Sequence, residues 1–219
     1  MKNRLINYSI VISGNLHNPT IINRDFLSIQ GIIPKEWNWE VEDDGVITTP
    51  PLAQVPYSNG VVIQVEPHKA QFSEKKIEDP GKSKIANIAT QFARTLKYVK
   101  YGAVGINFRC LFEIPSPEEF IQHRFLQNGK WNNSRHPIKA VGFRFVFEIQ
   151  EGKVTISLDA GTAKISSENS ELELPVVIVD ANFHRECTDY PADDQIEAYL
   201  KCVDNDWNLF QTIANDLLS

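Results

Sequence analysis

The amino-acid sequence predicts an α+β protein: an antiparallel sheet, or a pair of sheets, with two long amphipathic helices on one face. Several segments alternate apolar and polar residues, a pattern typical of half-buried strands. Two other segments carry apolar residues three or four positions apart, which is typical of amphipathic helices. A one-sided sheet and an amphipathic helix must each bury an apolar face, so we expect these elements to pack together.

Composition and charge limit the class of protein. The chain has 219 residues, of which 42% are hydrophobic, enough for a substantial core in one large domain or two small ones. Its formal net charge is −6, and the basic residues form no long cluster. An acidic chain repels the phosphate backbone, so nucleic acid is a disfavoured partner.

The sequence also indicates a cytoplasmic, non-membrane protein. The N-terminal segment lacks the uninterrupted apolar core and cleavage site of a signal peptide. No apolar run approaches the roughly 18 residues that suggest a membrane span. The cysteines are odd in number and widely spaced, which favours reduced thiols over a disulfide framework: Cys110, Cys187 and Cys202.

The first elements are a strand and a short helix. Residues 5–13 alternate and predict a half-buried strand with Ile6, Tyr8, Ile10 and Ile12 on one face. Asn18-Pro19 offers an N-cap and a first-turn proline for a helix through about Leu27. Residues 31–57 are irregular and proline-rich, and predict either a long loop or an arm with one edge strand.

A hairpin and the first long helix follow. Asn59-Gly60 is a turn signal before a strand over 61–66, and residues 70–74 return as its partner. Ser83 then caps an amphipathic helix. Its apolar stripe consists of Ile85, Ile88, Ala89, Phe92, Leu96 and Val99.

The next elements are another strand and a capped helix. Residues 102–113 predict a strand whose inner face carries Phe108, Cys110 and their neighbours. Ser116 to Glu119 reads as a capping box with proline at the first helical position, and Asn128-Gly129 ends the helix.

Three further strands and a long helix complete the chain. Strands are predicted over 141–150, 153–159 and 175–184, with Glu151-Gly152 as a two-residue hairpin turn and a polar loop at 166–170. A long amphipathic helix follows Pro191. Its stripe consists of Ile196, Tyr199, Leu200, Val203, Trp207, Phe210, Ile213 and Leu217.

The order of elements in residues 1–100 resembles that in residues 101–219. Each half has a strand, a short helix after a proline, a hairpin and a long helix, which raises the hypothesis of a duplicated β-α-β-β-α unit. We predict two α+β halves that share one sheet, in preference to two independent domains.

Alternation places several polar residues on the sheet face opposite the phenylalanines. The functional interpretation is a cleft in which an arginine grips an anionic ligand, because its planar fork suits a carboxylate or phosphate. The alternative is a solvated face with weak cross-strand ion pairs. The candidate ligand-binding residues are Arg109, Arg144, Glu148, Asp180 and His184.

Trp37 and Trp39 lie in the irregular segment beside an acidic patch. Exposed tryptophans on irregular backbone favour a protein-interaction surface, whereas the alternative is that both fill the protein's own core. The sequence contains no zinc-type histidine or cysteine spacing and no complete phosphate-binding glycine motif. We therefore predict no metal, no cofactor and no catalytic residue.

These observations predict a non-catalytic ligand-binding or protein-interaction protein. We expect a homo-oligomer or a protein partner, since pairing exposed sheet edges across a two-fold axis covers them. The alternative is a small intracellular hydrolase or isomerase that uses the polar sheet face as its cleft, which requires a concave pocket there.

Overall fold

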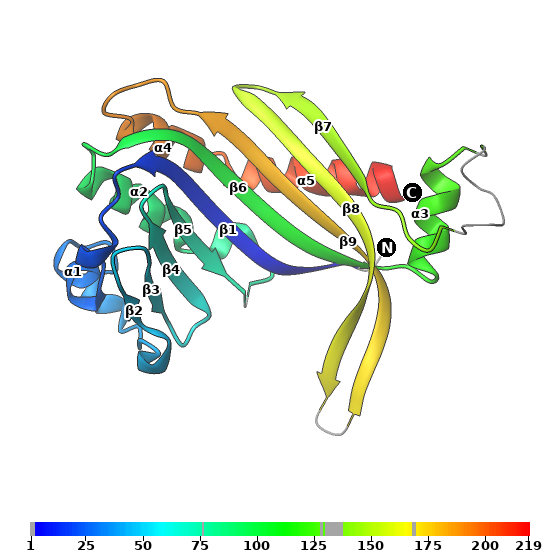
Figure 1. Cartoon of the computed structure of the whole chain (residues 1–219), viewed down its shortest axis with the longest axis horizontal. Helices are drawn as coiled ribbons and strands as arrows, with labels where there is room; N and C mark the ends of the chain where they lie inside the picture. The colour runs from blue at the N-terminus through cyan, green and yellow to red at the C-terminus, as the bar shows by residue number, and fades with distance from the viewer. Residues whose placement is uncertain (1–2, 76, 128, 130–137, 168–169) are drawn as a thin grey trace.

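The computed structural model describes residues 3–75, 77–127, 129, 138–167 and 170–219 (Figure 1). The strands are β1 (Asn3–Asn15), β2 (Ile47–Thr48), β3 (Ala53–Pro56), β4 (Val61–Glu66), β5 (Lys69–Glu74), β6 (Lys100–Glu113), β7 (Phe143–Ile149), β8 (Gly152–Ser167) and β9 (Ser170–Glu186). The α-helices are α1 (Arg24–Ile29), α2 (Ile85–Thr95), α3 (Pro117–Phe125), α4 (Asp193–Leu200) and α5 (Val203–Leu218). Short 3-10 helices span Pro19–Ile21, Lys35–Trp37, Asp43–Gly45 and Pro80–Lys82.

All described strands join one antiparallel sheet in the order β2-β3-β4-β5-β1-β6-β9-β8-β7. The two halves of the chain meet where β1 pairs with β6, from Asn3 opposite Phe112 to Asn15 opposite Lys100. This is a long ladder in the middle of the sheet. The first half supplies one side of the sheet and the second half supplies the other.

The long helices lie together on one face of the sheet. Figure 1 shows α2, α4 and α5 behind the strands, where α2 contacts β1 and β5, and α5 contacts β9. One continuous core lies between helices and sheet. Its largest fully buried side chains include Tyr8, Phe72, Phe92, Phe108, Phe112, Phe183 and Phe210. The predicted α+β class, with an antiparallel sheet and helices on one face, is confirmed, whereas a duplicated unit is not.

A β-bulge changes the inward face predicted for β1. The pairing with β6 shifts register between Leu5 and Asn7, so that Leu5 is buried and Ile6 is only half-buried. The extra residue of a bulge moves the side-chain alternation by one position. The prediction of Ile6 on the core face is therefore wrong, while Tyr8, Ile10 and Ile12 are fully buried as predicted.

Local turns and caps also differ from the predictions. The β7–β8 turn consists of Gln150 and Glu151, because Ile149 already pairs with Gly152. Ser116 has a left-handed backbone and makes no capping hydrogen bond to α3. The predicted C-terminal helix is divided at Lys201 and Cys202 into α4 and α5, although its apolar stripe remains on the core side.

The strands β8 and β9 continue well beyond the predicted lengths. Residues 162–167 of β8 pair with residues 170–175 of β9 beyond the ends of β7 and β6. Together they form a two-stranded arm that projects from the body of the sheet (Figure 1). The predicted polar loop at 166–170 is therefore too long, and its central residues lie outside the described part of the chain.

Candidate functional site

The polar face of the sheet brings together two of the predicted ligand-binding residues. Arg109 on β6 lies directly opposite Asp180 on β9. The Arg109 guanidinium donates from Nε to Oδ1 of Asp180 at 2.6 Å and from Nη2 to Oδ2 at 3.0 Å. Donating these hydrogen bonds to the Asp180 carboxylate raises the pKa of Arg109. The arginine fork is thus already engaged by a carboxylate of the same chain, at a site where both side chains are partly exposed.

A second polar pair lies beside the first. The Asn182 amide donates to Asn107 Oδ1 at 2.6 Å, and Asn107 donates to the Ser9 carbonyl at 3.3 Å. The two pairs border an open depression of about 370 Å³, whose lining includes Asn7, Thr155 and Ser157. The geometry therefore shows a shallow polar surface whose side chains bond to each other across the strands.

The other predicted ligand-binding residues share this face but not the depression. Arg144 lies opposite Ser157, which lies opposite Asp180, so Arg144 is two strands, or roughly 10 Å, from Asp180. Glu148 and His184 both lie opposite Lys153, on either side of it. The structure therefore places Arg144 and Glu148 at the edge of the sheet. Their role in ligand binding stays a prediction.

Trp37 and Trp39 pack on one another and on the sheet. Their ring centroids are 4.9 Å apart, and Trp39 meets the ring of Tyr57 edge-on at 5.5 Å. Both are half-buried against the core, and Lys84 lies over the Trp37 ring. This geometry favours the alternative in which the tryptophans anchor the irregular segment to the protein's own core.

A buried ion pair joins the sheet to a helix, and the sequence pattern did not single it out. Arg185 on β9 donates to Asp206 on α5 from both terminal nitrogens, at 2.8 and 2.6 Å. The two side chains are only 6% and 5% exposed. Arg185 stands next to the candidate His184 but points to the opposite, helix-covered face. The sequence contained one signal of this placement: Arg185 lies two residues after Phe183 on the same strand and therefore shares its inward face.

His17 is a buried titratable group without a hydrogen-bond partner. It is 4% exposed, and neither ring nitrogen has a partner within the described residues. Its ring lies 6.0 Å from that of Phe92 and 5.8 Å from that of Tyr101. Burial, and then the neighbouring His68, lower the pKa of His17 to about 4. This histidine is neutral in the folded protein at pH 7.

We expect the protein to lose stability as the pH falls from about 6.5 towards 4. In this range His17 binds a proton in the unfolded chain but stays neutral in the folded protein. The pKa of His17 is lowered on folding, so its contribution to stability is complete above the unfolded pKa of about 6.5 and is lost as the pH falls to the folded pKa of about 4. The loss is about 3 kcal/mol over that whole window, of which about 2 kcal/mol falls between pH 7 and pH 5. Urea unfolding at pH 7 and pH 5 measures the loss. The same two measurements on His17→Leu should show a smaller difference, and an equal difference would contradict the assignment.

Two of the three cysteines have thiols whose pKa is raised by burial. Burial raises the pKa of the Cys110 thiol to about 12 and that of Cys187 to about 11, which disfavours the nucleophilic thiolate.

No group of three histidine, cysteine or acidic side chains that could hold a metal ion occurs among the described residues. Within the same residues, no helix is long and apolar enough to cross a membrane.

The strand β7 is the last strand at one end of the sheet. The Cys187 N–H donates to the Gly102 carbonyl, which marks a hydrogen-bonded pair at the end of the β6–β9 ladder. Such pairs alternate along antiparallel strands. Followed through the registers of β9, β8 and β7, this alternation directs the N–H and C=O groups of Arg144, Val146 and Glu148 away from β8. In the described part of the chain no strand pairs with them.

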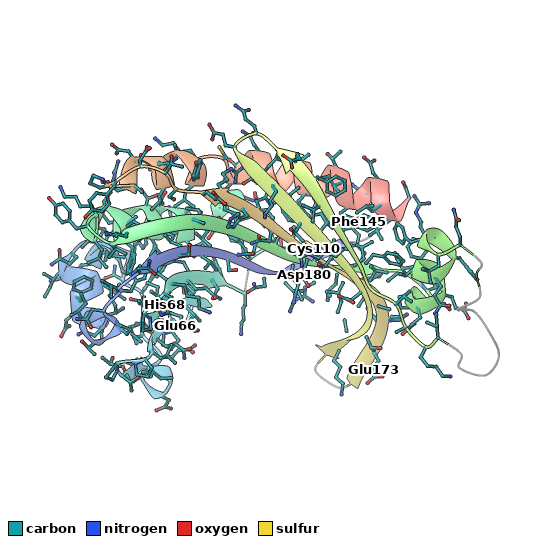
Figure 2. The ribbon with its side chains drawn as sticks, turned by 45° about the horizontal axis from the view of Figure 1, so that its top comes forward. Glu66, His68, Cys110, Phe145, Glu173 and Asp180 are labelled. Atoms are coloured by element: carbon teal, nitrogen blue, oxygen red, sulfur yellow. The ribbon has the colours of Figure 1, made fainter. Side chains whose placement is uncertain are left out.

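An aromatic row borders this edge on the helix-covered face. Phe143, Phe145 and Phe147 stack along β7 with centroids 6.2 and 6.4 Å apart, and each is only half-buried. Phe125 of α3 covers part of the row, at 5.1 Å from Phe143. Figure 2 shows Phe145 on β7, while Asp180 lies on β9 nearer the middle of the sheet. On the opposite face of β7, Val146 is 57% exposed.

Comparisons with protein-family models, with curated proteins and with solved structures found no match to this chain.

Proposed function

We propose that this protein is a non-catalytic interaction protein that binds another polypeptide chain along the outer edge of β7. The observation that supports this most directly is the row of outward-facing backbone groups on Arg144, Val146 and Glu148. An extended chain can add to such an edge as a new strand, with main-chain hydrogen bonds giving affinity and alternate side chains giving specificity.

The side chains around this edge support the same function. The half-buried phenylalanines provide apolar surface that a bound chain would cover, beside an edge with only part of the usual protection. Protected edge strands are short, or carry proline, charged side chains, above all lysine, or a bulge. The strand β7 has seven residues without proline or lysine, its charged residues are Arg144 and Glu148, of opposite sign, and its pairing with β8 is regular. The opposite edge, β2, has only two residues.

The polar face lends less support to a ligand-binding or catalytic cleft. Arg109 already makes a bidentate pair with Asp180, so gripping an anion would require that pair to open. The depression beside it is open, whereas an enzyme pocket normally excludes most water. The interaction protein is therefore the better-supported function.

Binding can be tested on an array of synthetic peptides in which apolar and polar residues alternate. Val146→Pro removes one outward N–H and leaves the bonds to β8 intact, so we expect the peptides held by the wild type to be lost. Thr48→Pro is the matched control at the opposite edge. The reciprocal bonds between Thr49 and Leu52 show that the N–H of Thr48 also points outward there.

The result expected is retention by the wild type and by Thr48→Pro, and loss of retention by Val146→Pro. Equal retention by all three proteins would place binding elsewhere and contradict the proposal. Urea unfolding midpoints close to wild type for both proline variants would show that neither substitution unfolds the sheet.

A further inference from the structure

We infer that the chain that pairs with β7 is β7 of a second copy, arranged antiparallel about a two-fold axis through Val146. This inference rests on the proposed function and names its partner. A two-fold axis makes the same surface face itself, so the edge must be complementary to its own sequence. The residues of β7 meet that condition in one register.

The outward backbone groups limit the registers that two copies can adopt. Within β7, the N–H and C=O groups of Arg144, Val146 and Glu148 face the edge, and the alternation makes Gly142 and Gln150 the next outward residues. In a paired register, each outward residue must lie opposite an outward residue of the second copy. If one β7 strand slid by a single residue along the other, outward-facing N–H and C=O groups of one copy would lie opposite inward-facing groups of the second copy. The permitted symmetric registers therefore differ by steps of two residues.

Charge selects one of these registers. Centring the axis on Val146 places Arg144 opposite Glu148 of the second copy, and symmetry repeats that pair at the other end. Centring on Arg144 or on Glu148 sets like charges directly opposite, which is destabilising. Centring on Phe145 or Phe147 leaves Arg144 and Glu148 opposite uncharged residues. Only the Val146 register pairs both charges and uses the whole length of β7.

The side chains of β7 on the helix-covered face favour the same register. Phe145 then lies opposite Phe147 of the second copy, and Phe143 lies opposite Ile149 of the second copy. Aromatic and β-branched pairs are among the most favourable across antiparallel strands. The half-buried row of one copy would thus be covered by the row of the other, and Val146, now 57% exposed, would meet its symmetry mate.

The test is sedimentation velocity of the full chain over a range of concentrations, with charge-reversed variants. Arg144→Glu and Glu148→Arg each set like charges opposite at two symmetric positions, so each should weaken dimerisation about tenfold or more. The double variant Arg144→Glu/Glu148→Arg exchanges the two charges and should return close to the wild-type dissociation constant. Val146→Pro should be monomeric, and Thr48→Pro should dimerise like the wild type.

Mixing the two single variants provides a second route to the same answer. Each weakens its own dimer, yet Arg144→Glu places two glutamates opposite the two arginines of Glu148→Arg. The mixture should therefore form a heterodimer more tightly than either variant forms a homodimer. This measurement remains informative if the double variant fails to fold.

A wild type that is monomeric at every concentration overturns the inference, as does a Val146→Pro variant that still dimerises. A double variant and a mixture both as weak as the single variants overturn the register. A monomeric wild type that retains peptides at β7 overturns the second copy alone and leaves the proposed function standing. A monomeric wild type that retains none overturns both.

Discussion

Replacing Asp206 with alanine is expected to lower the free energy of unfolding by about 3–5 kcal/mol, because it leaves the Arg185 guanidinium charged and unpaired inside the protein. The pair is bidentate and its side chains are 6% and 5% exposed. Burial raises the pKa of Asp206 even though Arg185 acts to lower it, so desolvation is costly at this site. Urea unfolding of the variant and the wild type measures the difference.

Two further variants identify the cause of that loss. Asp180→Ala breaks a pair of similar geometry whose side chains are 53% and 35% exposed, so it should cost less than about 1 kcal/mol. Arg185→Met/Asp206→Leu removes both buried charges and should recover most of the stability, since apolar residues of similar volume can replace a buried pair. A cost for Asp206→Ala as small as that for Asp180→Ala would contradict the buried-pair argument.

Phe108→Ala should destabilise the protein by about 3–5 kcal/mol, the range for deleting a large aromatic side chain from a core. Phe108 is 1% exposed and lies at the centre of an aromatic cluster on β6. Its ring centroid is 5.4 Å from Tyr8, 5.9 Å from Phe183, 5.1 Å from Trp207 and 5.8 Å from Phe210. The substitution removes contacts to β1, β9 and α5 together, and the cavity it leaves adds to the lost burial.

The measurement is the midpoint of urea unfolding. The slope of the free energy of unfolding against urea concentration should stay as in the wild type. Phe108→Leu should cost less because leucine fills part of the cavity. Tyr98→Ala, at a side chain that is 72% exposed, should change the free energy of unfolding by less than about 0.5 kcal/mol. If Phe108→Ala were as mild as Tyr98→Ala, the aromatic cluster would not be the centre of the core.

Local patterns predicted the elements well where both faces of an element have different surroundings. The strand over 61–66 has the predicted bounds, and its alternate residues Val61, Ile63 and Val65 are buried. The helix stripe starting at Ile85 is buried through Phe92. A one-sided sheet forces such alternation, because a slip of one residue would turn the apolar set to solvent.

Patterns failed where a single residue or a distant partner decided the structure. The bulge at Ile6 and the turn at Gln150-Glu151 each differ by one position from the prediction. Alternation cannot locate an extra residue, since the strand continues with the same period on either side. The arm was missed because residues 162–167 and 170–175 pair only with each other, and strand pairing between distant turns is not visible in local periodicity.

For the candidate site, the sequence predicted the face of the sheet on which the residues lie, but not which of them contact each other. Alternation correctly put Arg109, Arg144, Glu148 and Asp180 on one side of the sheet, but strand order decides which of them meet. That order pairs Arg109 with Asp180 and sends Arg144 and Glu148 to the edge. Local periodicity does not show which strand is the last of the sheet, so the edge position of β7 could not be predicted.

The sequence by itself determined the α+β class, most of the elements and their inward faces, since these follow from the local periodicity of apolar residues. Tertiary structure alone decided the strand order, the pairing of Arg185 with Asp206 across sheet and helix, and the exposed edge of β7. The physical reason is that periodicity is a property of neighbouring residues. Ion pairs and sheet edges depend instead on which distant segments lie side by side. Local propensity does not determine which segments become neighbours.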